Sequence, residues 1–160
     1  MTRDDPERTT PIGLLRYASE YLDAAIIVDD AEGEKPGYEI FAPVVVQYLI
    51  GHSIELSLKA FLLARGISLK ELRVKYGHQL RELLDLACRH GLDEQVTLSS
   101  QERDAVLVLD DLYSSKELEY IVTGAKRFPV HGPLESAAIR ILRGVAVAIG
   151  YPVTRIKHAV

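Results

Sequence analysis

One segment of the chain carries polar side chains at a spacing that could bring them together for chemistry. They are Tyr48, His52, Glu55 and Lys59. Their separations of four, three and four residues place them on one face of an α-helix. The rest of residues 41–63 is mostly apolar, as in the central helix of a bundle. Because ionisable groups are costly to bury unless paired, this face is either a structural network or a functional site, and both interpretations stay open.

The simplest interpretation of this face is an internal network of charges. Glu55 and Lys59 stand four residues apart, a spacing that allows an ion pair along a helix. Glu55 is alternatively a partner for Arg81 or His78 from the next helix. His52 and Glu55 are three residues apart, but di-iron bundles need Glu-x-x-His twice and two further carboxylates. Because the order here is reversed and occurs once, we predict no metal site and no cofactor.

A second candidate group pairs an arginine with a histidine just after the polar helix. Arg73 and His78 flank Val-Lys-Tyr-Gly. Arginine suits phosphate binding, and histidine suits proton transfer near neutral pH. The two residues are therefore candidate catalytic groups for RNA cleavage, with His52 and Arg81 as an alternative pair. In the interpretation without catalysis, His78 bonds to local backbone at a helix start.

Two surface segments are rich in cations. The first contains Arg65, Lys70, Arg73, Lys75 and Arg81, opposed by Glu71. It either meets phosphates or forms an ordinary solvated loop. The second mixes aromatic and basic residues, namely Tyr113, Lys116, Tyr120, Lys126 and Arg127. It either stacks on bases and binds a ligand or forms an ordered loop that closes the bundle.

Composition is that of one ordinary globular domain. The chain has 160 residues, of which 48% are hydrophobic and 26% charged, and a net charge of -4. A chain of this length buries enough surface to fold without a staple, and the single Cys88 excludes an internal disulfide. No leader is visible at the N-terminus, and charged residues interrupt the most apolar stretch. We expect a cytoplasmic protein that does not enter a membrane.

Helical periodicity and stop signals predict five helices joined by short loops, with no confident strand. Their expected ranges are about 10–30, 43–66, 78–91, 99–113 and 133–149. A short extra turn is expected within 114–123, and an irregular segment over 124–132. The fold class is therefore all-α, an up-and-down bundle of about five helices with its core over about residues 10–150 of a single domain spanning 1–160.

Two helix faces are candidates for close packing, against a neighbouring helix or a second copy of the chain. One is a stripe of small residues on the second helix: Ser53, Ser57, Ala60 and Ala64. The other is the apolar face of the last helix.

The pattern of the second and third helices resembles the HEPN superfamily, a group of small helical-bundle proteins mainly of prokaryotes. Those proteins carry Glu-x-x-Leu-Lys-Ala on one helix and His-Asp-Leu at the start of the next. Residues 55–60 match the first element. His78 and Leu80 match the second, with Gln79 in place of the acid. The resemblance covers roughly residues 10–150.

The resemblance implies a homodimer in a bacterial defence or toxin–antitoxin setting. Its members include interaction modules that hold a nucleotide, RNA or a nucleotidyltransferase-type partner protein, and metal-independent ribonucleases. The ribonucleases carry Arg, four to six residues and His near the last long helix. Here Arg140 and Arg143 lack such a histidine, and the Arg73–His78 spacing occurs earlier. We therefore expect a nucleotide- or RNA-interacting module without catalysis; a ribonuclease and a structural bundle with a buried polar network are the alternatives.

Overall fold

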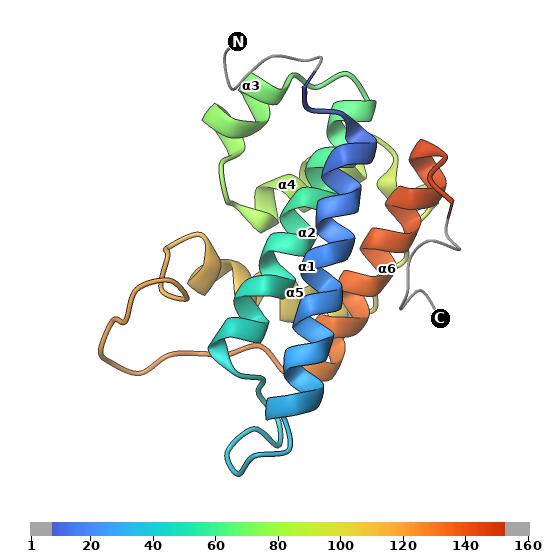
Figure 1. The fold of residues 1–160 in the computed structure, drawn as a ribbon. Coiled ribbons are helices and arrows are strands. Elements are labelled where there is room, and N and C mark those ends of the chain that lie inside the picture. Colours follow the sequence, from blue (N-terminus) through green and yellow to red (C-terminus); the bar gives the residue numbers. More distant parts are fainter. Residues whose placement is uncertain (1–7, 153–160) are drawn as a thin grey trace.

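The computed structural model describes residues 8–152, whose regular elements are all helices, with no strand among them. This confirms the predicted all-α class (Figure 1). The long helices are α1 (Pro11–Glu32), α2 (Val44–Ala64), α4 (Leu80–Arg89), α5 (Ser100–Tyr113) and α6 (His131–Ile149). Shorter elements are α3 (Leu69–Glu71), the π-helical turn η1 (Leu72–Tyr76) and the 3-10 turn η2 (Leu92–Glu94). No helix within residues 8–152 combines the length and apolarity needed to cross a membrane.

Capping side chains define the starts of two helices. Thr10 accepts a hydrogen bond from the Gly13 N–H at the start of α1, and Pro11 occupies the first turn. Ser99 and Glu102 form a reciprocal capping box at the start of α5. These side chains satisfy backbone N–H groups that the first turn of a helix leaves unpaired. Local sequence therefore determines where both helices begin.

Helix α2 lies at the centre of the bundle. Helices α1 and α6 run alongside it, and α4 and α5 pack across its other side (Figure 1). Its apolar residues Ile54, Leu58 and Phe61 are fully buried. The central position explains why α2 is apolar on nearly every side, and it also takes the polar face of the same helix into the interior.

The small-residue stripe of α2 packs inside the chain. Ser53 is buried and donates a hydrogen bond of 2.7 Å to the Ala18 carbonyl on α1. Ser57 and Ala60 are also buried, whereas Ala64 at the helix end is exposed. The apolar face of α6 is likewise buried within the bundle. Both faces therefore serve neighbouring helices of the same chain.

Two connections differ from the sequence expectation. The basic segment after α2, expected to be a loop, contains α3 and the π-helical turn η1. The extra helical turn expected within 114–123 is a series of turns. The segment then continues without regular structure to α6, which begins two residues earlier than expected, at His131. Spacing rules for α-helices do not identify a π turn, because its hydrogen bonds span five residues.

Candidate functional site: the Glu55 cluster and the Phe128 pocket

The polar face of α2 centres on Glu55, whose side chain is 3% exposed. The Lys59 ammonium donates to Glu55 Oε1 over 2.6 Å. The Tyr113 hydroxyl donates to Oε2 over 2.6 Å, and His78 Nδ1 lies 2.9 Å from the same oxygen. His52 Nδ1 lies 2.9 Å from the Tyr113 hydroxyl. We call these five residues the Glu55 cluster.

The hydrogen bonds of the cluster determine the tautomers of both imidazoles. An ionised carboxylate only accepts hydrogen bonds, so His78 must donate its Nδ1–H to Glu55. The single proton of the Tyr113 hydroxyl also goes to Glu55. His52 must therefore donate its own Nδ1–H to the Tyr113 oxygen. In their neutral forms both rings carry an unprotonated Nε2, the nitrogen that accepts a proton.

Glu55 is held ionised by its surroundings. Burial alone would raise the pKa of its carboxyl group. The His52 ring, the Lys59 ammonium and the Tyr113 hydroxyl outweigh burial and hold the pKa of Glu55 well below its usual range. The pKa of Tyr113 moves the other way, because burial and the adjacent Glu55 carboxylate disfavour its ionised form. Tyr113 therefore acts as a fixed hydrogen-bond donor.

Separate elements position His78 and Tyr113 around α2. The π turn η1 is followed by Gly77, whose φ of 50° and ψ of -116° form a backbone conformation that glycine adopts far more easily than other residues. The Tyr113 ring packs directly on Gly51, because a Cβ built there would lie 2.7 Å from Tyr113 Cδ2. Asp110, one turn before Tyr113, accepts a 2.7 Å hydrogen bond from the Leu80 N–H at the start of α4. This bond ties α5 to the helix start beside His78.

Aromatic rings surround the His52 side. Tyr21 of α1 meets the His52 ring edge-on, with the centroids 4.4 Å apart. Tyr48 lies parallel to His52, one turn earlier on α2. Burial raises the pKa of Tyr48. These rings restrict the His52 side chain to 23% exposure, whereas the His78 side chain is 46% exposed. His78 is thus the cluster member best placed to meet a ligand.

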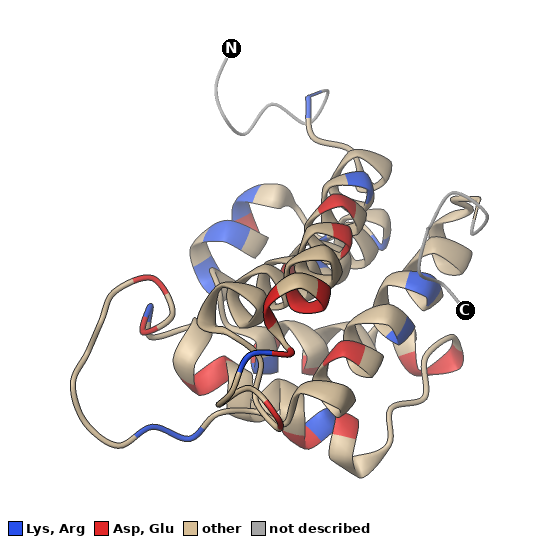
Figure 2. Cartoon of the chain, turned by 60° about the horizontal axis from the view of Figure 1, so that its bottom comes forward, with Lys and Arg blue, Asp and Glu red and all other residues tan. Residues whose placement is uncertain are grey.

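The arginines predicted to work with these histidines lie outside the hydrogen-bonded cluster. Arg73 is exposed on η1, and Figure 2 shows this short segment as one of the basic parts of the chain. Arg81 approaches Asp111, with 4.0 Å between Nη2 and Oδ1. The prediction that Arg81 is a partner of Glu55 is therefore wrong, whereas the alternative with His78 is confirmed. Lys59 as the helical partner of Glu55 is also confirmed.

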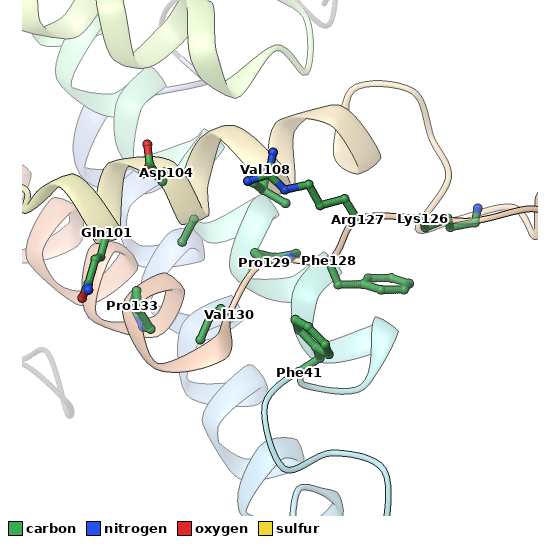
Figure 3. A pocket seen from close by; sticks show the side chains of 11 residues that line it. Phe41, Gln101, Asp104, Val108, Lys126, Arg127, Phe128, Pro129, Val130 and Pro133 are labelled. Carbon is green, nitrogen blue, oxygen red and sulfur yellow. The ribbon is translucent and has the colours of Figure 1, made fainter.

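A pocket of about 680 Å³ opens between α5 and the segment before α6 (Figure 3). Phe41 and Phe128 lie in its wall with ring centroids 6.2 Å apart. Arg127 also lines it, and no carboxylate in residues 8–152 pairs with its guanidinium. We call this the Phe128 pocket. Asp104 and Lys126 also line it, and a mainly apolar pocket with a few charged groups is the usual form of a small-molecule site.

The remaining aromatic and basic candidates are dispersed. Lys126 reaches the pocket but pairs with Glu117 over 2.9 Å. Lys116 pairs with Glu119 over 3.0 Å. Tyr120 is 68% exposed. The structure therefore brings Arg127, and in part Lys126, to a concave site, whereas Tyr113 of the same predicted group belongs to the Glu55 cluster.

Sequence reasoning missed Phe41 and Tyr21 as contributors to these surfaces. Phe41 precedes α2 and meets Phe128, 87 positions later, only through the fold. Tyr21 lies on α1 and reaches His52 through the close packing of α1 and α2. Neither residue stands at a diagnostic spacing from its partner.

Comparison with known proteins gives no further assignment, because no protein-family model, curated protein or solved structure matches the chain significantly.

Proposed function

We propose that the protein is a nucleotide- or RNA-interacting helical module that binds its ligand in the Phe128 pocket. The observation that carries this proposal is the pairing of two aromatic rings with the unpaired guanidinium of Arg127 in one pocket. A base stacks on Phe41 or Phe128, and a phosphate accepts hydrogen bonds from Arg127. The volume of about 680 Å³ lies within the range of small-molecule sites.

Calorimetric titration of the purified protein with AMP, ATP and a short single-stranded RNA tests this proposal. Phe128→Ala and Arg127→Ala should each weaken binding at least about tenfold, since base stacking and a charge-assisted hydrogen bond each contribute about 1–3 kcal/mol. Arg16→Ala removes an exposed arginine from α1 and is the matched control. Equal affinity in Arg127→Ala and Arg16→Ala would remove the pocket from consideration.

Metal-independent RNA cleavage is the second candidate, and the Glu55–His78 pair favours it. A buried carboxylate that fixes an exposed imidazole with an unprotonated Nε2 is the arrangement of an oriented general base. His78 Nε2 would take the proton of the ribose 2′-hydroxyl, and the 2′-oxygen would bond to the adjacent phosphorus. The bond from phosphorus to the 5′-oxygen would break, leaving a 2′,3′-cyclic phosphate and a 5′-hydroxyl protonated by water. Arg73, on the turn before His78, is the candidate phosphate ligand.

Cleavage of a mixed RNA substrate in the presence of EDTA separates this candidate from ligand binding alone. His78→Ala should abolish the cleavage while the variant melts like a folded protein. His90→Ala, which removes an exposed histidine after α4, should cleave at the wild-type rate. Absence of cleavage above background at high enzyme concentration would leave the Glu55 cluster as a structural network.

We also propose membership of the HEPN superfamily, homodimer formation and a role in bacterial defence or toxin–antitoxin systems. The helical class and the Glu55–His78 contact between the two matching elements support this proposal. Sedimentation velocity across a concentration series tests the dimer, and co-purification with neighbouring gene products tests for a nucleotidyltransferase-type partner. A protein that remains monomeric at all concentrations would contradict the proposed homodimer.

A further inference from the structure

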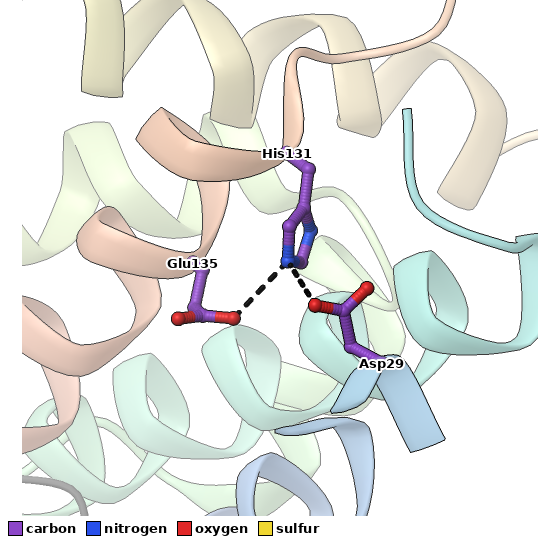
Figure 4. Close-up of side chains that lie close together, drawn as sticks. All are labelled: Asp29, His131 and Glu135. Carbon is purple, nitrogen blue, oxygen red and sulfur yellow. Dashed lines mark ion pairs between the residues drawn. The ribbon is translucent and has the colours of Figure 1, made fainter. Parts of the chain in front are cut away.

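A second polar cluster lies where the end of α1 meets the start of α6 (Figure 4). His131 Nε2 lies 3.0 Å from Asp29 Oδ2 and 3.1 Å from Glu135 Oε2. His131 and Glu135 are four residues apart on α6, so their side chains share one face of its first turn. Asp29 approaches from the last turn of α1. One donor atom from each residue lies within 4.8 Å of the other two.

The His131 side chain is 19% exposed and makes no hydrogen bond of adequate geometry to the described residues. Both ring nitrogens are shielded from solvent, and neither has a hydrogen-bond partner in residues 8–152. The carboxylates are close enough to His131 Nε2 in distance, but they do not meet the directional requirement of a ring N–H donor. Buried polar atoms of this kind need an explanation. A bound cation supplies one for Nε2, because it bonds to that nitrogen and to both carboxylates at once.

The spacing of the donor atoms suits one metal ion. Ligand atoms about 2.0–2.2 Å from a common metal ion lie about 3.0–3.6 Å apart, depending on whether the geometry is octahedral or tetrahedral. The Nε2–oxygen distances of 3.0 and 3.1 Å reach the lower end of this range. One imidazole with two carboxylates suits divalent first-row transition metals such as Mn²⁺ and Zn²⁺.

The surroundings of the cluster favour a cation. A pocket of about 610 Å³ adjoins it, and Asp29 and His131 stand in the pocket wall. The wall also contains Asp30, Glu34 and Glu39 and, among the described residues, no lysine or arginine. Such a concentration of carboxylates attracts cations. With three protein ligands, the metal would keep coordination positions for water or a ligand entering from this pocket.

We propose that Asp29, His131 and Glu135 form a binding site for a divalent transition-metal ion. The backbone holds the site in place, because the His131 N–H donates to the Ile40 carbonyl over 3.1 Å at the start of α6. In the metal-free protein, the Glu135 and Asp29 carboxylates raise the pKa of His131. The site is independent of the Glu55 cluster and of the Phe128 pocket, so its test does not depend on either.

The experiment uses full-length, tag-free protein stripped with a chelator and titrated calorimetrically with Zn²⁺ and with Mn²⁺. The expected result is saturable binding of one ion per chain. His131→Ala, Asp29→Asn and Glu135→Gln should each weaken it at least about tenfold, as loss of one protein ligand does. Asp30→Asn, which changes a neighbouring carboxylate of the same pocket, should bind like the wild type.

Other surface histidines could bind zinc, so His90→Ala serves as a second control. Unchanged binding in His131→Ala, or no saturable binding of either ion, would overturn the proposal. A crystal of the wild-type protein soaked in Zn²⁺ gives a readout that does not depend on variant folding. Anomalous density about 2.0–2.2 Å from all three donor atoms is expected, and its absence there at full soaking concentration would count against the site.

Discussion

At the scale of single residues, Glu55 determines the state of its neighbours. Its two oxygens accept hydrogen bonds from Lys59, Tyr113 and His78, and the last two bonds also define how the histidines hold their protons. A buried carboxylate with this many donors is stabilised in its ionised form. Removing its charge should therefore affect both the stability of the fold and the proton-accepting state of His78 and His52.

Glu55→Gln should destabilise the protein by about 3–5 kcal/mol near neutral pH, because it leaves the buried Lys59 ammonium without its counter-charge. Lys59 is 7% exposed, so water cannot replace the lost partner. Urea unfolding measures the change. The double variant Glu55→Gln/Lys59→Met should lose clearly less than the sum of the two single changes.

Glu34→Gln, at an exposed position, provides the control for this series and should change stability by less than about 0.5 kcal/mol. Strict additivity of the Glu55 and Lys59 changes would mean that the two residues do not act as a pair.

The partners of Glu55 show which contacts were predictable from sequence. Lys59 follows from helical spacing, and His78 follows from the expected start of the next helix. Tyr113 lies 58 positions from Glu55 and was predicted as part of a different ligand-binding group. Its contact with Glu55 depends on how closely α5 approaches α2, and spacing along the chain contains no information about that distance.

At the scale of elements, the contact of α2 with α5 depends on Gly51. Gly51→Ala should destabilise the protein by about 1–3 kcal/mol, the usual cost of overpacking a tight core. The new Cβ would lie 2.7 Å from Tyr113 Cδ2, so the ring must move and its hydrogen bond to Glu55 must weaken. Thermal unfolding measures the stability, and the tyrosine near-ultraviolet circular dichroism reports the displacement of the ring.

Gly132→Ala is the matched change, because Gly132 lies in the first turn of α6 and a Cβ there meets nothing within 4 Å. It should be neutral or slightly stabilising, since alanine favours helix over glycine. If Gly51→Ala behaved in the same way, the close approach of Tyr113 to α2 would not exist in solution.

Element boundaries were predictable where local chemistry defines them. The capping residues Thr10 and Ser99 and the stop signals after α2 and α4 placed the helices within a few residues of their observed ends. The π turn η1 and the early start of α6 at His131 were not predictable. Both depend on contacts with other elements, as the hydrogen bond from the His131 N–H to Ile40 illustrates. The Asp29–His131–Glu135 cluster was not predictable for the same reason, because it joins two helices that are distant in sequence.

At the scale of the whole molecule, the three sites involve different sets of elements of the bundle. The Glu55 cluster joins α2, α5 and the turn before α4, the Phe128 pocket borders α5, and the proposed metal site joins α1 and α6. A change confined to one site should therefore leave ligand binding at the others intact, whereas the stability of the bundle responds most to the buried charges of the Glu55 cluster.

The pH dependence of stability tests how the buried carboxylates act on the whole fold. The folded-state pKa of Glu55 lies below its ordinary value of 4.5, so its contribution to stability is full above about that pH and is lost as the pH falls. The pKa of Asp110 is raised above 3.8, chiefly by burial, so its contribution is present below that value and is lost as the pH rises. The pKa shift of Glu55 is larger than that of Asp110, so Glu55 should dominate the pH dependence of stability below about pH 5.

The stability gap between the wild type and Glu55→Gln should therefore be widest near neutral pH. It should narrow by up to about 1.4 kcal/mol for each pH unit below about pH 4.5, because only the wild type loses the favourable ionised Glu55 as the unfolded chain takes up a proton. Urea midpoints measured between about pH 3 and about pH 6 avoid the titration of His131, whose raised pKa acts above this window. In Asp110→Asn, the free energy of unfolding should decrease with falling pH at least as steeply as in the wild type, because the variant lacks a contribution of the opposite sign. Parallel profiles for the wild type and Glu55→Gln would show that Glu55 is not held ionised in the interior, and the tautomers inferred for His52 and His78 would then lose their basis.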